Sequence, residues 1–146
     1  MWQDIAEDLH AAALPASVRG DDGQPQPVIP LNSVYYIAVP DARTAHVLAA
    51  LLNSLPLRVF ARAAAERAKD ARFRFFAWTI AVLPLPLAWN TGAVADALEA
   101  LSLGAQEAGG ITPATQAQLD RLVAEAFGLA PERLEALWTF HTWLKR

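Results

Sequence analysis

Residues 33–56 read SVYYIAVPDARTAHVLAALLNSLP, and this stretch decides the fold. Its first seven residues, Ser33–Val39, are mostly β-branched or aromatic and are followed by a proline, which is the profile of a strand. Asp41 stands where a carboxylate can accept the free amide groups that open a helix, so a helix is predicted from Ala42 to about Asn53. Ser54 and Pro56 repeat this start signal and predict a second helix that runs to about Lys69.

The residues before this stretch comprise a short element and a loop. Residues 19–30 hold three prolines and two glycines and are predicted to form a loop. In residues 2–14, alanine and leucine favour a helix, whereas Leu9–Leu14 would equally suit a strand that returns against the next element. Composition alone leaves both options open.

The residues after the second helix predict one extended segment and a helical end of the chain. Phe73–Phe76 is expected to be extended, and the two prolines of Leu83–Pro86 exclude a helix that continues through them. Turn and cap residues then predict three helices, between Thr91 and Gly104, between Thr112 and Gly128, and from Pro131 to the end.

Length and composition limit the class of protein. The chain has 146 residues, the length of one domain, and 54% of them are apolar, which argues against disorder. The absence of cysteine excludes a disulfide framework and a thiolate metal site and fits a reducing compartment. The longest apolar stretch falls short of the roughly 20 residues that a membrane helix needs, and no secretory signal is recognisable. We expect a cytoplasmic protein with no membrane partner.

These observations together predict an α/β (α+β) fold. A small antiparallel or mixed sheet packed with helices is expected in residues 1–90. Residues 91–146 are expected to form a helical tail that packs on the same domain.

The net charge of −3 conceals a basic segment. Six basic residues lie between Leu57 and Phe76: Arg58, Arg62, Arg67, Lys69, Arg72 and Arg74. On the predicted helix Arg58 and Arg62 share a face, and on a strand Arg72 and Arg74 would point away from Phe73 and its neighbours. Clusters of this kind neutralise phosphates and release counterions, so all six residues are candidate DNA contacts. A solvated face on which Glu66 and Asp70 partly balance the charge remains the alternative.

Signals of catalysis are weak. The three histidines, His10, His46 and His141, lie far apart in the sequence, and no metal site is assigned. Asp41, Glu66 and Lys69 are distantly similar to the carboxylate and lysine pattern of metal-dependent nucleases. That pattern usually has one residue between glutamate and lysine, whereas here there are two, so a helix cap and a salt-bridging helix face are favoured.

Five short motifs follow one another in an order that resembles a known family: Trp2-x-Asp4-Ile5-Ala6, Pro30–Tyr36, Ala50–Ser54, Arg72–Phe76 and Leu83–Pro86. Over about residues 2–89 the chain is similar to the TaqI-like C-terminal specificity region of bacterial adenine-N6 DNA methyltransferases, which belong to restriction-modification and related phage-defence systems. The resemblance implies an α/β target-recognition module that helps to choose the DNA sequence while a separate catalytic domain transfers the methyl group. It also implies that Leu9–Leu14 is a strand paired with Ser33–Val39.

The departures from that family are equally informative. Such methyltransferases hold the flipped adenine with an Asn/Asp-Pro-Pro-aromatic motif and bind S-adenosylmethionine with a glycine-containing loop. Here Asn90 is followed by Thr91 and Gly92, and neither motif is present. The resemblance therefore implies a noncatalytic module without a cofactor, whose partners are double-stranded DNA and a catalytic methyltransferase domain or subunit.

The alternative function is a protein-interaction or oligomerisation module that docks a separate catalytic domain, or a second copy of itself, without binding DNA. The high apolar content and the acidic net charge favour this alternative. Asn53 and Ser54 are interpreted as a helix end and a cap rather than as base contacts. Phe73, Phe75 and Phe76 are interpreted as core residues rather than as wedges between bases.

Overall fold

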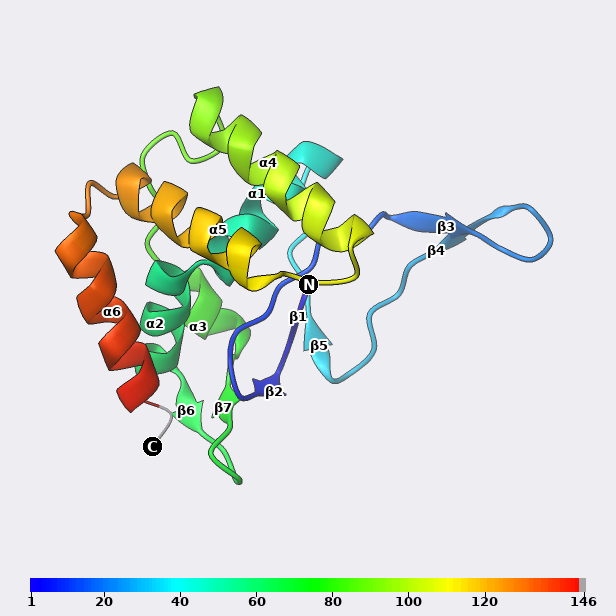
Figure 1. Ribbon diagram of the computed structural model, residues 1–146. Coiled ribbons are helices and arrows are strands. Elements are labelled where there is room, and N and C mark those ends of the chain that lie inside the picture. The colour runs from blue at the N-terminus through cyan, green and yellow to red at the C-terminus, as the bar shows by residue number, and fades with distance from the viewer. Residues whose placement is uncertain (145–146) are drawn as a thin grey trace.

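The computed structural model describes residues 1–144, which form helices and three small antiparallel sheets (Figure 1). The helices are α1 (Ala42–Asn53), α2 (Leu55–Ala64), α3 (Ala77–Ala81), α4 (Gly92–Glu107), α5 (Pro113–Ala126) and α6 (Pro131–Trp143). The strands are β1 (Trp2–Gln3), β2 (Ile5–Ala6), β3 (Ser17–Arg19), β4 (Pro25–Pro27), β5 (Val34–Tyr35), β6 (Glu66–Arg67) and β7 (Phe73–Arg74). The sheets pair β1 with β5, β3 with β4, and β7 with both β2 and β6. This arrangement confirms the α+β fold with a helical C-terminal part.

One hydrophobic core joins the N-terminal strands to the C-terminal helices. Trp2, Phe73 and Phe75 contribute from the strands and their neighbours, and Leu98 and Val123 contribute from α4 and α5. Helix α1 packs against α4, and α2 packs against α6. The indole of Trp2 donates a hydrogen bond of 2.7 Å to the carbonyl oxygen of Phe75, which fixes β1 beside the extended segment after β7.

The start of α1 was predicted correctly, whereas α2 begins by a different device. The carboxylate of Asp41 accepts a hydrogen bond of 2.7 Å from the amide of Thr44, as expected of an N-cap. The hydroxyl of Ser54 instead donates to the carbonyl oxygen of Leu51, and Asp120 of α5 accepts the amide of Leu55 at 2.7 Å. A carboxylate from a distant helix therefore replaces the local cap of α2.

The prediction that the second helix runs to about Lys69 was wrong. Helix α2 ends at Ala64, and Ala65 takes an extended conformation with ψ of 150°. The chain then enters β6, which pairs with β7 so that Arg67 lies opposite Phe73. This pairing holds Phe73 in the core, and burial of a large aromatic ring outweighs the helix propensity of residues 65–69.

The pairing of Leu9–Leu14 with Ser33–Val39 was also wrong. Strand β1 lies between these two segments, because Trp2 pairs with Tyr35 on one side and with Ala11 on the other. Trp2 stacks on Tyr35 with ring centroids 5.7 Å apart and is almost fully buried. Strand β1, anchored in the core by the indole of Trp2, thus occupies the place beside Ser33–Val39 that was predicted for Leu9–Leu14.

The prediction of a loop at residues 19–30 missed a hairpin of β3 and β4, which projects from the body (Figure 1). Gly20 donates to the carbonyl oxygen of Gln24, and Val28 donates to that of Ala16. The alternation of an antiparallel ladder therefore places Pro25 opposite Arg19, and Pro27 opposite Ser17, at positions without hydrogen bonds. The missing N–H of proline costs nothing there.

Within residues 1–144, no single helix is both long and apolar enough to cross a membrane. Helices α1 and α2 reach such a length only when they are counted together, and their axes are bent by 69° at the break between them. Most residues of α1 are buried in the core.

Candidate functional site

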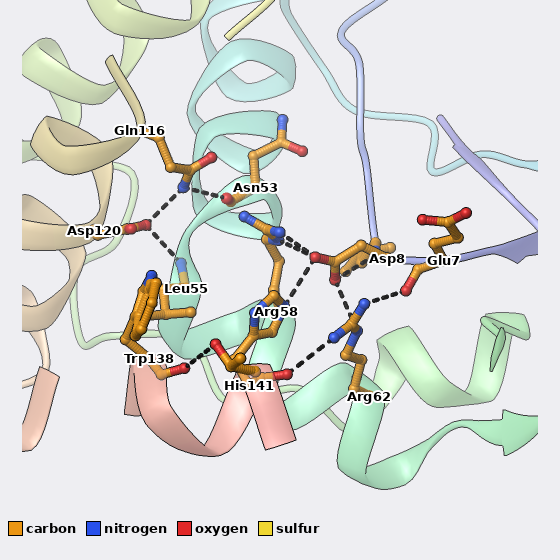
Figure 2. Close-up of polar contacts among 12 residues, drawn as sticks. Glu7, Asp8, Asn53, Leu55, Arg58, Arg62, Gln116, Asp120, Trp138 and His141 are labelled. Carbon is orange, nitrogen blue, oxygen red and sulfur yellow. Dashed lines mark hydrogen bonds and ion pairs between the residues drawn. The ribbon is translucent and has the colours of Figure 1, made fainter. Parts of the chain in front are cut away.

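A buried carboxylate, Asp8, gathers basic side chains from two helices (Figure 2). Arg58 of α2 donates through both Nε, at 3.0 Å, and a terminal nitrogen to Oδ2 of Asp8. Nε2 of His141 in α6 lies 2.9 Å from the same oxygen, and Nε of Arg62 lies 3.2 Å from Oδ1. Asp8 is only 4% exposed, so these contacts are made away from water.

The terminal nitrogens of Arg62 are also bonded inside the protein, whereas its Nε contacts Asp8 without forming a hydrogen bond. Its terminal nitrogens donate to the carbonyl oxygen of Glu7 and, at 3.1 Å, to that of His141. The guanidinium also lies over the ring of Phe73, 5.0 Å from its centroid. Arg62 is 2% exposed and links the N-terminal segment to α2 and α6.

The charge state of Asp8 follows from this geometry. Burial raises the pKa of Asp8, but the hydrogen bonds from His141 and Arg58 outweigh burial and hold this pKa well below the ordinary value. Asp8 is therefore an anion that neutralises buried guanidinium groups. The cluster joins three parts of the chain that are distant in sequence.

Two of the six predicted DNA contacts are corrected by this arrangement. Arg58 and Arg62 do share a face of α2, as expected, but this face is turned towards Asp8 and α6. The spacing of Arg58 and Arg62 predicts that they share a helix face but does not show whether that face meets solvent. Both guanidinium groups are held by the carboxylate of Asp8 inside the protein, and Arg62 is almost fully buried, so we assign the two arginines a structural role.

The other four basic residues lie on or next to the hairpin formed by β6 and β7, residues 66–74, which we call the basic hairpin. It projects from the body at the end opposite α4 (Figure 1). Its basic residues are Arg67, Lys69, Arg72 and Arg74, and its acidic residues are Glu66 and Asp70. The hairpin therefore carries a net charge of +2 on a protein whose total charge is −3.

The tip of the basic hairpin presents its charges to solvent. Lys69 and Arg72 are exposed, and the amide of Arg72 closes the turn by donating to the carbonyl oxygen of Lys69 at 3.3 Å. Asp70 lies 3.6 Å from Arg72 in an exposed ion pair. An exposed pair of this kind is weak and is screened by salt, so it leaves Arg72 able to exchange Asp70 for another anion.

The base of the basic hairpin is more rigid. Phe73 and Phe75 are buried, whereas Arg72 and Arg74 point to the other side, which confirms the alternation predicted from the sequence. The guanidinium of Arg74 lies over the ring of Phe76, 5.6 Å from its centroid. These contacts hold the strand that carries the arginines against the core.

Arg67 stands between the buried cluster and the exposed tip. Its guanidinium lies 4.9 Å from the centroid of the Phe73 ring, on the side that faces α6. One terminal nitrogen donates to the carbonyl oxygen of Leu144 at 3.3 Å. The residue is nevertheless exposed, so its remaining donors face solvent.

Other polar residues that the sequence singled out have structural roles. The side chain of Asn53 accepts from the amide of Ala11 at 2.9 Å and donates to its carbonyl oxygen at 2.7 Å, which confirms that Asn53 has a structural role. Nδ1 of His46 lies 3.1 Å from the hydroxyl of Ser102. In residues 1–144, no three histidines, cysteines or carboxylates are grouped so that they could hold a metal ion.

A second surface feature, on α6, was missed by the sequence analysis. Trp138 and Trp143 are each more than half exposed, and Phe140 stacks on Trp143 with centroids 5.7 Å apart. Phe140 and Leu137 also line an apolar hollow of about 510 Å³ that reaches Pro84. The signal was present in the sequence, since three aromatic residues lie in the last turns of the helix predicted from Pro131.

Comparison with known proteins adds no relative. No protein-family model matches the chain, and no curated protein or solved structure is detectably similar to it.

Proposed function

We propose that the protein is a noncatalytic DNA-binding module, and that the basic hairpin is the part that contacts the duplex. The observation that carries this proposal is the separation of charge. Four basic residues project from the body on one short ribbon, while the rest of the chain has an excess of acidic residues. Phosphate groups attract such a ribbon and are repelled by the remaining surface, so the duplex meets the protein in one orientation.

The shape of the basic hairpin suits this role. At its base β7 also pairs with β2, so only the part of the basic hairpin between Arg67 and Phe73 projects freely as two strands. A two-stranded β-ribbon fits into the major groove of B-form DNA. In this arrangement Lys69 and Arg72 at the exposed tip contact the phosphates that border the groove, and Arg67 and Arg74 at the base lie closer to the body. Phosphate contacts position the duplex, and an arginine that reaches a guanine edge supplies sequence choice.

The contrast with the other projecting hairpin supports the choice. The hairpin of β3 and β4 carries Arg19 together with Asp21 and Asp22, so its net charge is negative. Two ribbons of similar form thus differ in the sign of their charge, and only the basic hairpin is attracted to phosphate.

The family resemblance supplies the biological setting of the proposal. A target-recognition module of an adenine-N6 DNA methyltransferase in a restriction-modification or phage-defence system would bind DNA while a separate catalytic domain transfers the methyl group. The absence of the adenine-pocket and S-adenosylmethionine motifs from the sequence agrees with a module of this type.

The test is binding of a fluorescein-labelled 30-base-pair duplex, followed by fluorescence anisotropy at low salt. The double variant Lys69→Glu/Arg72→Glu is expected to lose affinity by about tenfold or more, because two phosphate contacts become repulsive. Its matched control is Arg19→Glu/Arg121→Glu, which changes the net charge equally at two exposed arginines elsewhere. Equal losses in both double variants, or no binding by the wild type, would overturn the proposal.

A second candidate function is supported by the exposed aromatic surface of α6. Trp138, Phe140 and Trp143, next to the apolar hollow, suit a protein-interaction module that docks a catalytic domain. The two candidates differ in their response to salt. Docking through aromatic residues tolerates high salt and is weakened by Trp138→Ala/Trp143→Ala, whereas binding through the basic hairpin is lost as salt rises.

A further inference from the structure

An apolar groove of about 550 Å³ lies over α1, between the segment that precedes β3 and the segment that follows β5. One rim is residues 11–16 and the other is residues 36–41, and the floor includes Ala45, Leu48 and Ala49 of α1. We call this feature the α1 groove. It is made by residues that take no part in the basic hairpin, so the following inference does not depend on the proposed DNA contact.

Strand β1 leads directly into the α1 groove. Met1 and Ala12 exchange two backbone hydrogen bonds, of 3.0 and 2.9 Å, which makes them a hydrogen-bonded antiparallel pair. On the other side, Trp2 pairs with Tyr35, again in the antiparallel direction. The two rims of the groove are therefore the continuations of the two chains that flank β1.

The rims have backbone groups available for a further strand. Among residues 1–144, the backbone amide and carbonyl groups of residues 36–39 make no hydrogen bond to another backbone group, and the same holds for Ala13 and Leu14. Antiparallel pairing alternates with a period of two. Ala12 and Tyr35 pair with β1, so two residues further on the backbone N–H and C=O groups of Leu14 and Ile37 are expected to be directed into the groove.

The lining defines the side chains that fit. Leu14, Ile37 and Tyr36 are exposed apolar residues of the rims. The one charged side chain of the lining belongs to Asp41, and its carboxylate already accepts the amide of Thr44. The lining holds no cationic side chain, and its one cationic group, the α-ammonium of Met1, already donates to the carbonyl oxygen of Ala12.

The orientation of Trp2 indicates which residues of an added strand would face α1. Its side chain is buried towards the core, and alternate residues of a strand point to the same side. Residues of an incoming strand that are in phase with Trp2 would therefore lie over Ala45 and Ala49, whose small side chains leave room for a larger apolar one. The residues between them would face solvent.

We propose that the α1 groove binds an extended, apolar segment of a partner polypeptide by strand addition. The segment runs in the direction of β1, antiparallel to both rims, and hydrogen-bonds to Leu14 on one side and to Ile37 on the other. Valine, isoleucine or leucine at alternate positions fills the space above α1. Backbone pairing supplies affinity, and the apolar floor supplies specificity, as in other cases of strand addition.

The experiment selects ligands for the whole chain from a phage-displayed library of random octapeptides. Enrichment of proline-free peptides with apolar residues at every second position is expected. Binding of a synthetic peptide from that set is then measured by fluorescence anisotropy. Ile37→Pro, which removes an N–H directed into the groove, is expected to weaken binding by about tenfold or more. Leu87→Pro, at an exposed turn position outside the groove, is the matched control.

A second readout keeps the result interpretable if a proline variant is unstable. Hydrogen exchange of the wild-type protein is expected to slow at the amides of Leu14 and Ile37 when the peptide is bound. Three outcomes would overturn the proposal: no enrichment of alternating peptides, exchange at these two amides unaffected by the peptide, or equal binding by the Ile37→Pro and Leu87→Pro variants. Sedimentation of a dimer that Ile37→Pro dissociates would assign the groove to a second copy of the chain instead.

Discussion

The two halves of the basic segment have the same kind of side chain and opposite environments. Arg58 and Arg62 on α2 are held by the buried carboxylate of Asp8, whereas Lys69 and Arg72 on the basic hairpin face solvent. Spacing in the sequence does not distinguish them, because each half shows basic residues on one face. The role of a basic residue in this segment therefore depends on whether a buried carboxylate lies within reach of its side chain.

The energetics of the two halves differ accordingly. Removing one partner of a buried ion pair leaves an uncompensated charge and costs about 3–5 kcal/mol, whereas an exposed pair contributes about 0–1 kcal/mol. The Asp8 cluster thus holds the N-terminal segment, α2 and α6 together. The basic hairpin contributes little to stability and has charges available for a ligand.

The largest effect is expected from removing the charge of Asp8. Asp8→Asn should lower the free energy of unfolding by about 3–5 kcal/mol, because the guanidinium groups of Arg58 and Arg62 stay buried without an anion. The matched control is Asp70→Asn on the basic hairpin, which should change it by less than about 0.5 kcal/mol. Urea unfolding followed by circular dichroism measures both. Similar values for the two variants would contradict the assigned roles.

A smaller change in the free energy of unfolding is expected when one arginine from each half of the basic segment is replaced by the uncharged methionine. Arg62→Met should lower the free energy of unfolding by about 1–3 kcal/mol, because the carbonyl oxygens of Glu7 and His141 lose their donor. Asp8 keeps its contacts with Arg58 and His141, so its charge is not left uncompensated. Arg72→Met should leave it within about 0.5 kcal/mol of the wild-type value. Thermal unfolding measured by calorimetry distinguishes them, and a larger loss in Arg72→Met would reverse our assignment.

Acid should remove the contribution of Asp8. A carboxylate whose pKa is lowered on folding stabilises the protein above its ordinary pKa of 3.8, and this stabilisation is lost as the pH falls through the folded-state value. The difference in unfolding free energy between wild type and Asp8→Asn should therefore be constant above about pH 5 and shrink below pH 4. A difference that grows towards low pH would contradict the lowered pKa. The measurement is urea unfolding at a series of pH values.

The smallest effect concerns the tip of the basic hairpin. Asp70→Asn removes the acidic partner of Arg72, so duplex affinity should rise by about two- to threefold at low salt. Asp70 has a positive φ of 59°, a conformation that asparagine also tolerates, so the turn is retained. Anisotropy titration measures the change. A loss of affinity would mean that Asp70 supports the contact rather than opposing it.

Much of the helical structure could be predicted from the sequence, because its signals are local. Asp41, Thr112 and Pro131 mark helix starts through backbone chemistry that depends on adjacent residues alone. The end of α2 could not be predicted in this way. It depends on the pairing of β6 with β7, and this pairing depends on the burial of Phe73.

The candidate site was predicted only in part for a related reason. The sequence shows six basic residues but not that Asp8, 50 residues before Arg58, lies beside them. His141 is further still, 133 residues from Asp8. In the hairpin, by contrast, alternation between Phe73 and Arg74 is a local pattern, and the orientation of the arginines followed from it. Contacts between distant residues decide which cations are structural.

The salt dependence of duplex binding tests the central claim, that the basic hairpin contacts DNA, most directly. The slope of the logarithm of the binding constant against the logarithm of salt concentration is measured for the wild type and for Lys69→Gln/Arg72→Gln. Each neutralised phosphate contributes about 0.9 to this slope, so the double variant should have a slope shallower by about 1.8. An unchanged slope would contradict our account and would place the cations that meet DNA elsewhere.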